Sequence, residues 1–411
     1  MRVLRRVTAS GMALCAAAVA FTACSSDSSG SGGKPSDSVA LTVIAPTNSK
    51  PPNFPELIAS AKAAATAVNA KGGIKGKQIE IKTCNESNNP NDATKCARQA
   101  VANHSVAVVG SFSTYGQQVT QILAGAGIPY IGFNGATPAE YACSTCYEFD
   151  AGSTLVFAGL PGALRASGAK TVQPIALDLA ASAANVAGVE QAAKAAGLRT
   201  LPAVKVGVTS TDLAPAVQAV IQSKADAAVS ILPTELTLAF IKAADQAKAS
   251  FTFGVVDGQI QSGVSQIHGT QDDHLLVVGA YPPVDADDKY PGIAQYNREL
   301  DAAVKAGDKD ASIRNSSGLR AWLTVHVVAE VGAGITGDVS ASSLNTAFKS
   351  AKDVDLLGIL PKWTPSAKGT IHGFDRVSSA RVFFLRLGDG KFTAAKPVAG
   401  VDLTSGKPFT D

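Results

Sequence analysis

The fold class is decided by three consecutive stretches, VALTVIAP (39–46), PELIASAKAAATAVNA (55–70) and KQIEIKT (77–83). The first and third are short and rich in β-branched residues, which favours strands. The second is Ala-rich, has the length of a helix and is stopped by Gly72-Gly73. A strand, a helix and a strand in this order predict two parallel strands joined by a crossover helix.

The same alternation continues along the chain on both sides of residue 150. The expected strands are 105–112, 128–133, 171–178, part of 200–208, 227–233, 251–258 and 275–282, and the expected helices are 91–104, 115–124, 154–168, 183–197, 213–223 and 235–248. Residues 291–352 are expected to be mostly helical, and 379–392 to form a hairpin around Gly388-Asp389-Gly390. The sequence therefore predicts an α/β protein with two Rossmann-like lobes, each built on a parallel sheet.

The N-terminus has the layout of an export signal. Arg2 to Arg6 form a positive region, and Ala13 to Phe21 form an apolar stretch that is short for a membrane span. The following Phe21-Thr22-Ala23-Cys24 resembles a bacterial lipobox, which predicts a signal peptide over 1–23, a lipid on Cys24 and a flexible Ser/Gly tether over 24–38. Ordinary signal cleavage, with Cys24 an incidental thiol, is the alternative.

Four further cysteines fall in the exported part of the chain. In an oxidising compartment Cys84, Cys96, Cys143 and Cys146 predict two disulfides, for which three pairings exist. The local pairs Cys84–Cys96 and Cys143–Cys146 are favoured. The alternative for Cys143-Ser144-Thr145-Cys146 is a redox motif or half a zinc site, but no second CxxC accompanies it.

Charge and motifs exclude several function classes. The net charge of +3 comes from the three arginines of residues 1–23, so the remaining chain is formally neutral and lacks the basic block that nucleic acid requires. No HExxH, GxSxG or Walker A motif occurs, and Gly332, Gly334 and Gly337 form a GxGxxG that follows a helix rather than a strand. Asp272-Asp273-His274 is expected to be a solvated turn, and His326 a half-buried structural residue. An enzyme is therefore the less favoured interpretation.

A resemblance to a known family rests on VNAKGGIKGKQIEI (68–81), NPNDATKCARQAV (89–101), VAVVGSFST (106–114), AGIPYIGFNGATPAEY (126–141) and GVVDG (254–258). These stretches resemble the type I periplasmic binding proteins of the branched-chain amino-acid class. The resemblance covers nearly the whole mature chain. It implies two lobes joined by a multi-strand hinge, with lobe 1 formed by 39–150 and 283–371 and lobe 2 by 151–282 and 372–411.

The same resemblance implies a ligand site between the lobes. In the family, hydroxyls and backbone N–H groups at strand ends hold the ligand carboxylate; these positions fall on Ser113, Thr114, Gly135 and Thr137. The alternative is that the hydroxyl residues are helix N-caps, and one residue can do both. An acidic position for the ligand ammonium falls on Asp257. Three aromatic wall positions fall on Ser182, near Pro233-Thr234 and near Asn53-Phe54. A second acidic position falls near Thr154, where this chain has no acid.

The implied function is a solute-binding lipoprotein that delivers its ligand to the permease of an ABC importer. Because one acid is missing, we expect a small ligand with a carboxylate or amide end, such as an amino acid or an analogue, rather than necessarily a branched-chain amino acid. The protein is expected to be monomeric, to use no cofactor or metal, and to be held at the outer face of the bacterial cell membrane only by its lipid. The alternatives are a ligand sensor for a membrane receptor and an exported enzyme.

Overall fold

The computed structural model describes residues 38–49, 53–179, 182–260, 263–264, 267, 274–369, 371, 373–377, 380–388 and 391–410. The expected signal peptide, almost all of the expected tether, Cys24, Asp272, Asp273 and the hairpin residues Asp389 and Gly390 lie outside these ranges. Within them, no helix has the length and apolar character that crossing a membrane requires.

The first sheet has five parallel strands in the order β2-β1-β3-β4-β5. These strands are β1 (Ser38–Ala45), β2 (Gln78–Asn85), β3 (Ala107–Val109), β4 (Tyr130–Ile131) and β5 (Cys146–Tyr147). The helices that connect them are α1 (Pro55–Ala70), α2 (Pro90–Ala102), α3 (Gly116–Gly125) and α4 (Pro138–Ala142). The strand and helix alternation predicted from residues 39–83 is confirmed, and α4 and β5 are additional elements.

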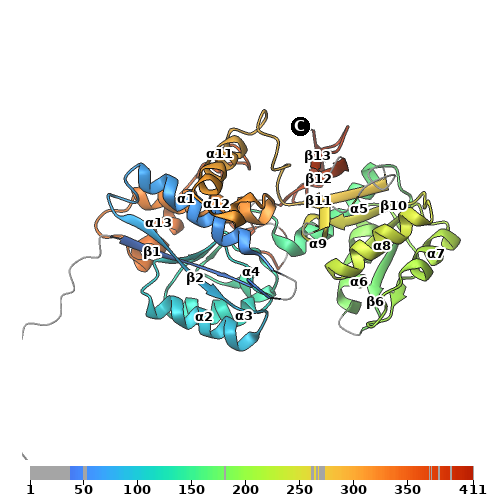
Figure 1. Cartoon of the computed structure of the whole chain (residues 1–411), viewed down its shortest axis with the longest axis horizontal. Coiled ribbons are helices and arrows are strands. Elements are labelled where there is room, and N and C mark those ends of the chain that lie inside the picture. The colour runs from blue at the N-terminus through green and yellow to red at the C-terminus, as the bar shows by residue number, and fades with distance from the viewer. Residues whose placement is uncertain are drawn as a thin grey trace, which may run out of the picture. The chain divides into compact units, whose positions relative to one another are not determined.

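Both faces of the first sheet are buried at β1, β3, β4 and β5, which explains why these strands are mainly apolar, whereas most residues of the edge strand β2 are partly or fully exposed. Leu41 and Val43 of β1 pack in the core cluster that includes α1, whereas the neighbouring Ile44 packs in the second cluster with α2 and α3. Figure 1 shows α1 on one side of this sheet and α2 and α3 on the other. Successive side chains of a strand point to opposite faces, so alternate residues serve two different helix layers.

The second sheet has the order β15-β14-β12-β11-β10-β9-β6-β7, with β8 paired to β6 and β13 to β12. Its parallel part contains β6 (Thr171–Leu177), β7 (Arg199–Thr200), β8 (Val204–Val206), β9 (Ala227–Ile231), β10 (Thr252–Val256) and β11 (Leu275–Gly279). The helices of this part are α5 (Gly152–Ala166), α6 (Ser182–Ala195), α7 (Ala214–Ser223), α8 (Thr234–Gln246) and the short α9 (Asp257–Ile260).

The C-terminal strands make this sheet mixed rather than wholly parallel. The expected hairpin is present as β12 (Arg381–Gly388) and β13 (Lys391–Ala394), and β12 pairs antiparallel with β11. Two further strands that the sequence did not predict, β14 (Gly400–Asp402) and β15 (Lys407–Phe409), extend the same edge. A hairpin reverses the chain without a crossover helix, so β13 pairs antiparallel with β12, and β15 with β14.

Residues far apart in sequence pack together around the first sheet. After β11 the chain forms α11 (Pro291–Lys305), a 3-10 turn (Lys309–Ser312), α12 (Ser316–Ala333) and α13 (Ala341–Ser350), which confirms the predicted helical segment. Helix α12 packs on α1, and the Lys75 ammonium donates hydrogen bonds to the carbonyl oxygens of Ile335 and Gly337. Gly110 has φ +52°, and a Cβ there would lie 2.5 Å from the Cα of Ala321, so only glycine allows this approach. Gly334 is the C-cap of α12, as expected for a helix end.

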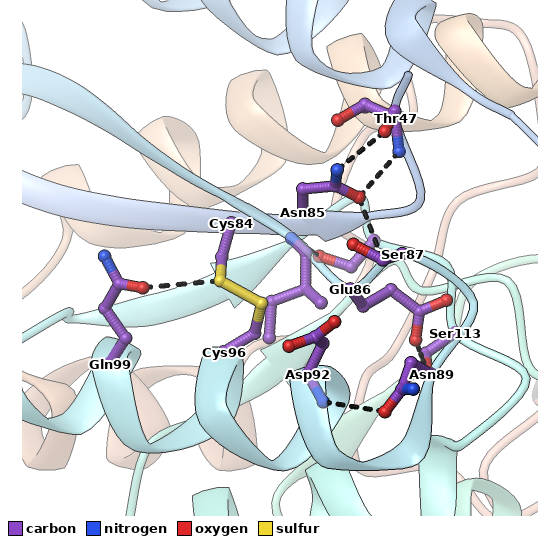
Figure 2. The surroundings of a disulfide bond; sticks show 12 residues. Thr47, Cys84, Asn85, Glu86, Ser87, Asn89, Asp92, Cys96, Gln99 and Ser113 are labelled. Atoms are coloured by element: carbon purple, nitrogen blue, oxygen red, sulfur yellow. Dashed lines mark hydrogen bonds between the residues drawn. A yellow bond between two sulfur atoms is a disulfide. The ribbon is translucent and has the colours of Figure 1, made fainter. Parts of the chain in front are cut away.

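Two disulfides are present, with the local pairing that the sequence favours. Cys84 at the end of β2 is bonded to Cys96 on α2, and Cys143 after α4 is bonded to Cys146 on β5. Figure 2 shows the first bond linking strand and helix, with Asn85 beside it bonded to the backbone of Thr47. The disulfide thus ties α2 to the end of β2, and Asn85 at the same end holds the loop that follows β1.

Candidate functional site

A small cavity lies where residues from both sheets and from α12 meet. Its volume is about 70 Å³, and it is lined by Phe54, Asn134, Gly152, Ser153, Val156, Val256, Asp257, Gly258, Ala280, Ser316, Ser317 and Arg320. Phe54 follows β1 and Asn134 follows β4, whereas Asp257 and Ala280 follow β10 and β11. The carboxyl ends of parallel strands are the usual ligand-binding edge of open α/β sheets.

A larger and shallower hollow of about 680 Å³ lies between α12 and α13, with Thr336, Thr346 and Lys352 among its lining residues. It contains no strand end and no group from the second sheet. The small cavity, where polar groups from several elements converge, is therefore the better candidate site.

Arg320 is the cation of this cavity. Its Nε donates to Oδ2 of Asp150 at 2.7 Å, and the two side chains are 5% and 0% exposed. Tyr281 donates its hydroxyl to the same oxygen at 2.5 Å, and its ring lies 5.4 Å from the guanidinium carbon. Desolvation opposes the charge of Arg320, but Asp150 and Tyr281 outweigh it and raise the pKa of the guanidinium above its usual value.

Only one edge of the Arg320 guanidinium is used. Among the described residues, neither Nη atom has a hydrogen-bond partner, although the side chain lines the cavity. Asp150 has less freedom, because its Oδ1 also accepts from the N–H of Gly152 at 2.7 Å. The carboxylate thus fixes the arginine while the Nη donors remain available.

Glu148 lies two residues before Asp150 and is fully buried. Its Oε1 accepts from the N–H groups of Phe149 and Asp150, and its Oε2 has no partner. Burial, reinforced by the neighbouring Asp150, raises its pKa well above the usual value. Glu148 therefore favours the protonated form, which leaves Asp150 as the carboxylate that balances Arg320.

Asp257 is the acid of the cavity wall. Ser316, the first residue of α12, donates its hydroxyl to Oδ2 at 2.5 Å, and the N–H of Gly258 donates to Oδ1 at 2.7 Å. Desolvation raises the pKa of Asp257, although these hydrogen bonds and Arg320 lower it. The Ser316 bond directly links the end of a second-sheet strand to a helix that packs on the first sheet.

Of the ligand contacts predicted from the sequence, Phe54 and Asp257 line the cavity. Phe54 precedes α1, is half-buried and packs edge-on against Phe112, with ring centroids 5.0 Å apart. This contact fixes an aromatic wall next to the polar groups.

Thr137 and Gly135 lie close in sequence to the cavity residue Asn134, but they do not line the cavity. Oε2 of Glu140 accepts from the N–H groups of Ala136 (2.9 Å) and Thr137 (2.8 Å) and from the Thr137 hydroxyl (2.9 Å). Thr137 is the residue that precedes α4, so its donors serve the start of that helix. Burial raises the pKa of Glu140 to about 7 despite these bonds. The carbonyl of Gly135 accepts from Tyr141 and Ser153.

The remaining predicted contacts are also outside the cavity lining. Ser113 is fully buried and donates its hydroxyl to Glu86, as Figure 2 shows, while it accepts from the N–H of Tyr115 at 3.0 Å. Thr114 is exposed just before α3, and Ser182 is the half-buried first residue of α6.

Sequence reasoning missed Arg320, Ser316, Ser317 and Ser153 as cavity residues. Arg320 stands in an apolar helix, and its partner Asp150 is 170 positions away. The one available signal was an arginine within LRAWLTVHVV, where a charge on a buried helix needs a partner.

No metal centre is built from the described residues, because no three His, Cys, Asp or Glu side chains gather to form one. His326 is half-buried and lies 2.9 Å from Glu299, whose carboxylate also accepts from Trp322. This places His326 in a structural pair, away from the cavity residues.

Comparison with protein families gives a match to the one described as periplasmic binding protein, over residues 44–385. No curated protein sequence matches the chain.

Three solved structures illustrate the similarity in fold. A possible leucine/isoleucine/valine-binding protein from Rhodopirellula baltica SH 1 is 16% identical, with 88% of this chain and 97% of that chain covered and a TM-score of 0.68. A solute binding protein of an ABC transporter from Rhodopseudomonas palustris BisB5, in complex with 3,4-dihydroxybenzoic acid, is 17% identical, with 90% and 99% covered and a TM-score of 0.67. A fatty acid ABC transporter substrate-binding protein from Thermomonospora curvata is 15% identical, with 91% and 92% covered and a TM-score of 0.66.

Proposed function

We propose that this chain, which belongs to the family of type I periplasmic binding proteins, captures a small solute outside the cytoplasm and delivers it to an ABC importer. The ligand carries a carboxylate or amide end and binds in the cavity between the strand ends of the two sheets. The observation that carries this proposal is the lining of that cavity, where Phe54, Asp257 and Arg320 converge from three separate parts of the chain.

Capture involves a separation of the two sides of the cavity. Ligand pockets usually measure roughly 300–1,000 Å³, and the present cavity of about 70 Å³ is much smaller. We expect the lobes, 39–150 with 283–371 and 151–282 with 372–411, to open about the segments that cross between them and to close on the ligand. Glu148 and Val377 form a bridge between two of these crossing segments, which supports a hinge there.

The related structures support the carboxylate end of the ligand. The compounds in their descriptions, branched-chain amino acids, a dihydroxybenzoic acid and a fatty acid, differ in size but all carry a carboxylate. A cavity with both a cation and an acid, and with hydroxyls at Ser153, Ser316 and Ser317, has the polar groups that such ligands require.

We further propose that the protein is exported as a monomeric lipoprotein. Cys24 receives a diacylglyceryl group on its thiol and becomes the new N-terminus after cleavage behind residue 23, and the tether 24–38 holds the folded part at the outer face of the membrane. Two acyl chains on one residue give stable anchoring. Cys24→Ser should move the protein from the membrane fraction to the soluble fraction and abolish incorporation of a labelled fatty acid. A variant that stays acylated would refute the assignment.

The ligand site is tested by identifying solute that co-purifies with the protein, by mass spectrometry, and by titrating that solute calorimetrically. Phe54→Ala should weaken binding at least about tenfold, because it removes the aromatic wall. The control is Phe392→Ala, which truncates a similarly half-buried ring on β13 and should leave affinity unchanged. Equal affinities for both variants and the wild type would contradict this cavity as the site.

A further inference from the structure

The guanidinium of Arg320 is held on one side and open on the other. Asp150 occupies its Nε edge at 2.7 Å, and the ring of Tyr281 packs on it. The Nη atoms have no partner among the described residues, and the side chain lines the cavity. An arginine fixed in this manner presents planar N–H donors with little further loss of side-chain entropy, which is the arrangement that favours a bidentate carboxylate.

Several strand-end donors of the first sheet are already used. The N–H groups of Ala136 and Thr137 and the Thr137 hydroxyl all donate to Glu140, and the Ser113 hydroxyl donates to Glu86. Both glutamates are fully buried. A ligand anion would have to displace a carboxylate of the protein itself to reach these donors.

We propose that Arg320 is the residue that recognises the ligand, and that the ligand class is a small organic carboxylate whose two oxygens accept from the Nη groups. Asp150 and Tyr281 are positioning residues that fix the guanidinium. This inference rests on the proposed function and selects the acid from the two ligand classes given there. The body of the ligand lies against the apolar part of the lining, formed by Phe54, Val156 and Val256.

The local charges are compatible with a bound anion. Asp150 balances the charge of Arg320, and Glu148 favours its protonated form. Burial also raises the pKa of Asp257, which lines the same cavity. Asp257 receives two hydrogen bonds from the protein and therefore remains satisfied.

The test uses pairs of ligands that differ only in the group that Arg320 would recognise. Benzoate and benzamide, 3-methylbutanoate and 3-methylbutanamide, and octanoate and octanamide are titrated calorimetrically into the purified protein. We expect at least one acid to bind at least about 100-fold more tightly than its amide, because two charge-assisted hydrogen bonds are replaced by weaker ones.

Substitution of Arg320 should remove this discrimination. Arg320→Met should reduce the affinity for the acid about 100-fold and leave the affinity for the amide nearly unchanged. Because Arg320→Met leaves Asp150 buried without its partner, the double variant Arg320→Met/Asp150→Asn is measured alongside it and should give the same result in a folded protein. Arg320→Lys, which keeps the charge but not the planar donors, should retain part of the discrimination.

Thr137→Val distinguishes Arg320 from the strand-end donors. If Arg320 holds the anion, Thr137→Val should leave the ratio of the acid affinity to the amide affinity unchanged. The inference would be overturned if Thr137→Val lost acid binding while Arg320→Met/Asp150→Asn retained it. Binding of amides but not acids would also overturn it while leaving the proposed function standing. Failure of every acid and every amide to bind would count against both.

Discussion

The buried pair of Arg320 and Asp150 gives the sharpest prediction for stability. The two side chains are 5% and 0% exposed. Among the described residues, only the Tyr281 hydroxyl and the Gly152 N–H would still donate to Asp150 in Arg320→Met. Removing one partner of a buried ion pair leaves an uncompensated charge and costs about 3–5 kcal/mol. That is a large part of the roughly 5–15 kcal/mol by which a domain is usually stable.

The double variant distinguishes the cost of the uncompensated charge from the cost of lost packing. In Arg320→Met/Asp150→Asn, the amide oxygen still accepts from the N–H of Gly152, the amide nitrogen donates to the Tyr281 hydroxyl oxygen, and no net charge remains buried at the pair. Neutral replacement of a buried ion pair is often close to neutral in stability. We therefore expect the double variant to lie within about 1 kcal/mol of the wild type, and thus to be more stable than Arg320→Met alone.

Urea unfolding monitored by tryptophan fluorescence is suited to this measurement. The only tryptophans, Trp322 and Trp363, are 0% and 2% exposed and should report unfolding around α12 and the region that packs on it. Circular dichroism on the same samples checks that both halves unfold in one transition. The reasoning is refuted if Arg320→Met loses less than about 1 kcal/mol, or if the double variant loses as much as the single one.

Three further predictions concern pH, a disulfide and a glycine. The pKa of Glu140 is about 7 in the folded chain against a usual 4.5, so the free energy of unfolding of the wild type falls by on the order of 3 kcal/mol as pH rises through this interval. Glu140→Gln should make this pH dependence shallower in a series of thermal unfolding measurements, and the same pH dependence in both proteins would contradict the prediction. Replacing Cys84 and Cys96 by serine should cost about 3 kcal/mol in urea unfolding, from the loop that their separation of 12 closes; an unchanged midpoint would count against this. Gly135→Ala should lower the free energy of unfolding by about 1–3 kcal/mol, because its Cβ would lie 2.5 Å from a ring carbon of Tyr141. In the control Gly162→Ala, the Cβ meets nothing within 4 Å, so stability should be unchanged or slightly higher, and equal effects of the two variants would exclude the clash.

Local signals predicted the elements that depend on local interactions. Helix α1 spans Pro55–Ala70 as expected, because proline suits a first helical turn and Gly72 and Gly73, with φ of +101° and +67°, end it. By contrast, the predicted strands 105–112 and 128–133 are reduced to β3 and β4, with three and two residues. How much of an apolar run becomes strand depends on which residues a neighbouring strand pairs with, and this is not encoded in the run itself.

The candidate site shows the same division. Phe54 and Asp257, which the family resemblance indicated, do line the cavity. Arg320 was not identified as a cavity residue, because the sequence does not show which acid a charged residue in an apolar helix pairs with. The role of Thr137 was open between ligand contact and helix cap, and the structure shows its hydroxyl bonded to Glu140.

The sequence by itself determined the alternation of strands and helices, the local disulfide pairs as the favoured choice and the family resemblance, since each depends on residues near one another in the chain. The tertiary structure decided that residues 316–333 return to pack on α1, and that Arg320 meets Asp150 and Tyr281 beside Phe54 and Asp257. The contacts of α12 with α1 and of Arg320 with Asp150 join positions more than a hundred residues apart. They form because a sheet buried on both faces needs helices that one continuous stretch of chain does not supply.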